Sequence, residues 1–86
     1  MGKYEKLYLQ ILSGAADHSI RFEDLRWFLK RLGFSERIRG SHHIFTRDQV
    51  AEIINIQPKG NNAKPYQVKQ IRNLVTQYKL GAMGDE

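Results

Sequence analysis

Apolar residues recur along the start of the chain at the spacing of one helix face. They occupy positions 4, 7, 8, 11 and 12, and the stretch around Gly14 interrupts the pattern. A second apolar stripe at positions 25, 28, 29 and 32 predicts a helix over residues 22–32, which Gly33 ends. The pattern therefore predicts two consecutive helices in the N-terminal third of the chain.

The spacing changes after residue 35. Residues 36–46 alternate over short distances and include β-branched and aromatic side chains, which predicts a strand, and residues 46–49 suit a turn. Residues 50–57 predict either one long strand or a shorter one over 53–57, closed by the turn-forming residues 58–62. Pro65 suits the first turn of a last helix, whose apolar positions 68, 71, 75 and 78 share one face.

This order of elements predicts an α+β fold. Two helices would bury their apolar stripes on one face of a small antiparallel sheet, and the other face would stay open. At 86 residues the chain has room for one small domain. It has no cysteine, which excludes disulfides and thiolate metal sites, and no apolar run long enough for a transmembrane helix or a signal peptide. We expect a cytoplasmic protein.

Positive charge gathers in the second half of the chain. Residues 37–79 contain eight lysines and arginines but only two acids, Asp48 and Glu52. Such a surface attracts phosphate backbones by Coulomb force and counterion release. The charge therefore favours nucleic-acid binding, with a basic face for an acidic protein partner as the alternative.

The segment R-G-S-H-H-I-F, residues 39–45, sets two of the three histidines side by side. Neighbours on a strand point to opposite faces, so His42 and His43 cannot readily chelate one metal ion, and His18 lies in a different segment. We therefore expect no metal. A nucleophilic Ser41 is also disfavoured, because sequence neighbours rarely reach the required geometry and no orienting acid is evident.

General-base cleavage of RNA needs less machinery, because the ribose 2′-hydroxyl is itself the nucleophile. A histidine titrates near neutral pH, and general-base catalysis contributes about 10²- to 10⁴-fold. Arg37 and Arg39 would stabilise charge on the phosphate, and Gly40 would let the backbone approach it. On the residues alone, half-buried packing of a histidine in a strand remains the competing interpretation.

These segments together resemble a known family. A basic amphipathic helix ending in L-G-F leads into R-x-x-G-S-H-H-I-F, then a strand ending in I-Q-P, and finally the helix P-Y-Q-V-K-Q-I-R-N-L-V. This order resembles the HicA (YcfA-like) toxins of bacterial toxin–antitoxin modules. The resemblance covers residues 22–80, which leaves residues 1–21 as an N-terminal helical extension and 81–86 as a flexible tail.

The resemblance implies a fold like a double-stranded-RNA-binding domain, with a three-stranded antiparallel sheet packed against two helices. It also implies a translation-independent mRNA interferase that uses no cofactor and is neutralised by a HicB-type antitoxin covering the site. One histidine of the Gly-Ser-His segment would be the base. We favour His42, which directly follows Gly-Ser, and keep His43 as the alternative. The candidate RNA-binding residues are Arg37, Arg39, Gly40, Ser41, Lys59, Lys64, Lys69 and Arg72.

One departure from the family concerns the end of the second predicted strand. Many members carry a histidine before the proline where this chain has Gln57-Pro58. If that histidine assists catalysis elsewhere, this protein would be slower or inactive. A non-catalytic RNA-binding module of the same fold is therefore the alternative function, and the sequence leaves open whether the protein is a monomer or a weak dimer.

Overall fold

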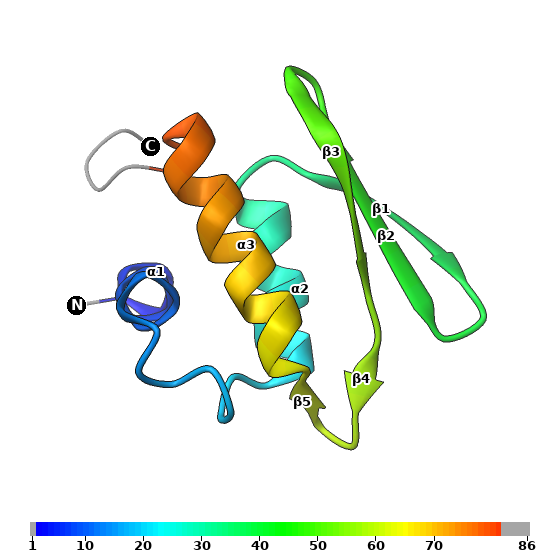
Figure 1. The fold of residues 1–86 in the computed structure, drawn as a ribbon. Helices are drawn as coiled ribbons and strands as arrows, with labels where there is room; N and C mark the ends of the chain where they lie inside the picture. Colours follow the sequence, from blue (N-terminus) through cyan, green and yellow to red (C-terminus); the bar gives the residue numbers. More distant parts are fainter. Residues whose placement is uncertain (1, 82–86) are drawn as a thin grey trace.

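The structure is a computed structural model that describes residues 2–81. Within them lie the helices α1 (Lys3–Ser13), α2 (Phe22–Arg31) and α3 (Pro65–Tyr78). The strands are β1 (Ser35–Arg39), β2 (His42–Arg47), β3 (Val50–Ile56), β4 (Pro58–Lys59) and β5 (Asn62–Ala63). Helices α2 and α3 lie between α1 and the antiparallel sheet β1-β2-β3 (Figure 1). This arrangement confirms the predicted α+β fold, in which the helix, three strands and helix of a double-stranded-RNA-binding-type domain follow an extra N-terminal helix.

The three helices begin and end within one or two residues of their predicted limits. After α1, Gly14 takes a φ of 73°, in the left-handed region that glycine adopts without strain. Helix α2 has acids in its first turn and basic residues in its last, which suits the helix dipole. Helix α3 begins at Pro65, where the missing N–H costs no hydrogen bond. Of the tail predicted for residues 81–86, all but Gly81 lies outside the described residues.

The prediction of one strand over residues 36–46 is wrong, because this stretch folds back on itself. Strand β1 ends at Arg39, β2 begins at His42, and Gly40-Ser41 forms the turn between them. Gly40 alone of the two has a positive φ, 58°, as in a type II′ turn, whose twist suits paired strands. A two-residue turn does not interrupt the alternation of side chains, so the sequence pattern continues through the reversal.

The next reversal occupies the second half of the predicted turn at residues 46–49. Only Asp48 and Gln49 connect β2 to β3, which takes the longer of its two predicted extents. The turn-rich stretch 58–62 forms the short hairpin β4-β5 in place of a simple turn. The amide of Ala63 donates to the carbonyl of Ile20 at 2.8 Å, so this hairpin is fixed to the start of α2.

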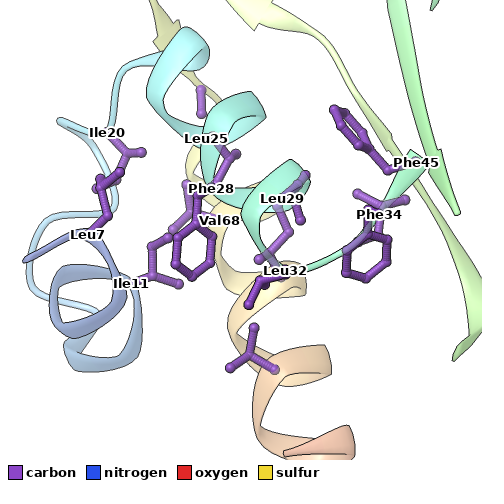
Figure 2. Close-up of a cluster of buried hydrophobic side chains, with 14 of the residues drawn as sticks. Leu7, Ile11, Ile20, Leu25, Phe28, Leu29, Leu32, Phe34, Phe45 and Val68 are labelled. Carbon is purple, nitrogen blue, oxygen red and sulfur yellow. The ribbon is translucent and has the colours of Figure 1, made fainter. Parts of the chain in front are cut away.

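A single hydrophobic core lies between the helices and the sheet. Phe28 of α2 and Phe45 of β2 are fully buried in it. Helix α1 adds to the same core, because the ring of Tyr4 stacks on that of Phe28 with 5.5 Å between centroids. The labelled core side chains of Figure 2 are Leu7, Ile11, Ile20, Leu25, Phe28, Leu29, Leu32, Phe34, Phe45 and Val68. The N-terminal extension therefore completes the core of the domain.

Candidate functional site

The two adjacent histidines of β2 lie on opposite faces of the sheet. His42 is exposed on the face that no helix covers. The side chain of His43 points toward the helices, is 14% exposed, and meets the ring of Phe22 edge-on with 4.9 Å between centroids. The alternation of a strand predicts this separation, and it rules out one ion shared by both rings.

Both ring nitrogens of His42 have polar neighbours from the end of β3. Its Nδ1 is 3.2 Å from Oδ1 of Asn55, and its Nε2 is 3.1 Å from Nε2 of Gln57. Lys64 Nζ donates to Oε1 of Gln57 at 3.2 Å, which identifies the Gln57 nitrogen as the donor toward the ring. His42 Nε2 is therefore an acceptor and Nδ1 a donor, so these contacts select one neutral tautomer.

The strand pairing explains why Gln57 and Asn55 meet His42. His43 pairs with Ile56, so the adjacent position brings His42 beside Gln57, and Asn55 is its diagonal neighbour on the same face. The hydroxyl of Ser41 accepts from Nε2 of Gln57 at 3.3 Å. The position where this chain departs from many HicA toxins is thus in direct contact with the favoured histidine.

The open face carries positive charge around His42. Arg39 pairs with His42 and Arg37 pairs with Ile44, so both arginines project from the same face as His42. The positions of β1, β2 and β3 that share this face include no carboxylate. At the turn, a Cβ added to Gly40 would meet nothing within 4 Å, so the backbone here is open to a large ligand. A polyanion can approach His42 from this side without meeting a negative side chain.

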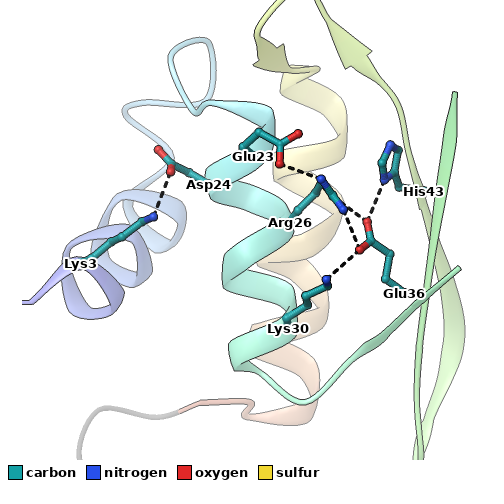
Figure 3. A network of polar contacts seen from close by, with 7 residues as sticks. All are labelled: Lys3, Glu23, Asp24, Arg26, Lys30, Glu36 and His43. Atoms are coloured by element: carbon teal, nitrogen blue, oxygen red, sulfur yellow. Dashed lines mark hydrogen bonds and ion pairs between the residues drawn. The ribbon is translucent and has the colours of Figure 1, made fainter. Parts of the chain in front are cut away.

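On the other face, His43 belongs to an ion-pair network around Glu36 (Figure 3). The Glu36 carboxylate is 5% exposed and accepts hydrogen bonds from Arg26 at 2.6 and 2.9 Å. His43 Nδ1 lies 2.8 Å from the same carboxylate, and Lys30 Nζ lies 3.1 Å from it. The hydrogen bonds from Arg26, with those from His43 and Lys30, lower the pKa of Glu36 from 4.5 to about 2. The arrangement gives His43 a packing and pairing role beneath the sheet.

A buried glutamine holds the backbone of the His42 partners. Gln67 of α3 is 2% exposed, and its Nε2 donates to the carbonyl of Asn55 at 3.4 Å. The amide of Gln57 donates to Oε1 of Gln67 at 3.3 Å. Helix α3 thus caps the free edge of β3 next to the site. Sequence reasoning missed Asn55 and Gln67, although the shared parity of residues 53, 55 and 57 places Asn55 on the open face.

Four of the predicted RNA-binding residues do not contact His42 or its partners. Lys59 is exposed two residues after Gln57. Lys69 is exposed about 200° around α3 from Gln67, so it faces away from β3. Arg72 is bound to α1, where it donates to the carbonyl of Ile11 and pairs with Asp17, both at 3.0 Å. We therefore omit Arg72 from the site, while Arg37 contributes from its place on the open face.

Two further searches covered the described residues. No cluster of three or more His, Cys, Asp or Glu side chains lies close enough there to hold a metal ion. In the same part of the chain, every helix is too short or too polar to cross a bilayer.

Comparison with known proteins gives one match. The sequence model of a family described as "HicA toxin of bacterial toxin-antitoxin" matches residues 22–79. The match runs from the first residue of α2 to the residue after α3, and so includes the whole sheet and the His42 site. No curated protein and no solved structure matches the chain.

Proposed function

Because this chain belongs to the HicA family of toxins from bacterial toxin–antitoxin systems, we propose that it is a metal-independent endoribonuclease with His42 as general base. The observation that carries the proposal is the setting of His42. Its ring is exposed on the basic open face, with Asn55 at Nδ1 and Gln57 at Nε2. These contacts leave Nε2 unprotonated, which is the form that a base needs before it takes a proton.

The proposed reaction uses the ribose of the RNA as nucleophile. Its 2′-hydroxyl gives its proton to Nε2 of His42 while the oxygen attacks the adjacent phosphorus. The new O2′–P bond replaces the P–O5′ bond, and the leaving 5′ oxygen takes a proton from water. The products are a 2′,3′-cyclic phosphate and a 5′-hydroxyl end.

Cations on the open face would stabilise the charge that develops on the phosphate. Arg39, opposite His42, is placed to contact the scissile phosphate, and Arg37 a neighbouring one. The open backbone at Gly40 leaves room for the RNA strand. On this proposal the target is mRNA in the cytoplasm, and the neutralising partner is a HicB-type antitoxin that covers this face.

Asn55 would position the base without contacting the RNA. We expect Asn55→Ala to lower kcat about tenfold, because the ring loses the acceptor that fixes its tautomer and orientation. Asn55→Asp keeps an acceptor oxygen and should restore most of kcat. The measurement is steady-state cleavage of a fluorescent RNA, with Asn73→Ala on the exposed side of α3 as the matched control. A change confined to KM would contradict a positioning role.

The direct test is incubation of the purified protein with single-stranded RNA in excess EDTA. We expect cleavage to continue and to leave 2′,3′-cyclic phosphate ends, because base, cations and nucleophile are all present without a metal ion. Loss of activity in EDTA, with recovery on adding a divalent cation, would contradict the proposed mechanism. Salt-sensitive binding of duplex RNA without any cleavage would instead support the non-catalytic RNA-binding module.

A further inference from the structure

The side chain of Gln57 lies between the proposed base and a lysine. Its Nε2 is 3.1 Å from Nε2 of His42, and its Oε1 accepts from Lys64 Nζ at 3.2 Å. The carboxamide therefore presents a hydrogen-bond donor to the base and an acceptor to the cation. A reacting RNA link has the same polarity, since its 2′-hydroxyl is a donor and the oxygens of its adjacent phosphate are acceptors.

We propose that the Gln57 carboxamide occupies the position of the scissile link in the free protein, and that RNA displaces it. The 2′-hydroxyl then takes the place of the Gln57 nitrogen at His42, and a phosphate oxygen takes the place of Oε1 at Lys64. Lys64 is thereby the cation that binds the scissile phosphate. This inference rests on the proposed function, and it adds the phosphate ligand and an internal competitor of the substrate.

The anchoring of Gln57 suits a side chain that moves while its backbone stays in place. Gln67 holds the backbone amide of Gln57 from inside the fold. The side-chain contacts with Ser41 and His42 are exposed, so water or a ligand can replace them at little cost. A rotation of the Gln57 side chain can therefore open the site without disturbing β3.

The place of Lys64 suits a phosphate ligand. Lys64 is the N-terminal cap of α3, a helix of 14 residues, and the partial positive charge of that helix end adds to the charge of its ammonium group. Its ammonium group is already directed toward the Gln57 carboxamide beside His42. The lysine needs no large movement to exchange a carboxamide oxygen for a phosphate oxygen.

Kinetics of two variants test the inference. Gln57→Ala should raise kcat/KM about two- to tenfold, chiefly through a lower KM, because the competing hydrogen bonds are gone. Lys64→Gln should lower kcat/KM about 10²-fold, whereas Lys6→Gln, the same change on exposed α1, should leave it unchanged. A loss in Gln57→Ala as large as that in His42→Ala, or equal activity of the two lysine variants, would overturn the inference.

A binding measurement separates this inference from the proposed reaction. The side-chain amide signals of Gln57 are followed by NMR while a single-stranded DNA oligonucleotide, which lacks the 2′-hydroxyl, is added to the intact protein. We expect the signals to shift in the wild type and to stay unchanged in Lys64→Gln. Unchanged signals in the saturated wild type would overturn the displacement. If they shift as expected but RNA is never cleaved, the ribonuclease proposal fails while the phosphate site at Lys64 stands.

Discussion

His42→Ala should lower RNA cleavage about 10²- to 10⁴-fold while the protein remains folded, because it removes the general base from an exposed position. The free energy of unfolding should change by less than about 0.5 kcal/mol, as is usual for an exposed side chain. The measurements are single-turnover cleavage of a defined RNA and urea unfolding of the same preparation.

His43→Ala is the matched comparison, since it makes the same change one residue along the strand. Here we expect a loss of stability of about 1–3 kcal/mol, because the ring packs on Phe22 and hydrogen-bonds the nearly buried Glu36. The folded fraction should retain most of its cleavage activity. If a folded His43→Ala protein were inactive while His42→Ala cleaved RNA normally, the base would be His43.

Glu36→Gln should destabilise the protein at neutral pH by roughly 3 kcal/mol. Arg26, His43 and Lys30 lower the pKa of Glu36 from 4.5 to about 2, and that difference corresponds to roughly 3 kcal/mol. Because the folded-state pKa is the lower one, this contribution is complete above pH 4.5 and disappears as the pH falls to about 2. Urea unfolding of wild type and variant at pH 7, 4.5, 3 and 2 should therefore show curves that converge in acid.

The neighbouring Glu23 supplies the control for this titration. It accepts from the same Arg26 side chain at 2.7 Å but is 70% exposed. Glu23→Gln should cost less than about 1 kcal/mol, because an exposed ion pair is screened by water and salt. Parallel curves for wild type and Glu36→Gln across the whole pH range would mean that the carboxylate charge does not stabilise the fold.

Local patterns predict the helices and the separation of the two histidines. The apolar stripes and the residues at the helix ends are properties of short segments, so α1, α2 and α3 follow from spacing alone. That His42 and His43 lie on opposite faces follows from strand alternation. The reversal at Gly40-Ser41 could not be derived in this way, because a two-residue turn leaves the alternation intact.

Contacts between distant segments could not be predicted from spacing. Gln57 and Asn55 meet His42 only because β2 and β3 pair in one particular alignment, which the sequence pattern does not specify. The charge of Arg72 counts toward a basic stretch in the sequence, yet in the fold it is paired with Asp17, 55 residues away. For the same reason the pairing of Glu36 with His43 and Arg26 emerges only from the structure.

The hairpin that carries the two histidines would tolerate no slippage between its strands. Shifting β2 by one residue would exchange the faces of all its side chains, setting His43 on the open face and His42 beneath the sheet. Because the two residues are chemically identical, the histidines themselves cannot distinguish the two alignments. Phe45 can, since it would leave the core for water. A phenylalanine that never contacts RNA thereby selects which histidine is presented as the base.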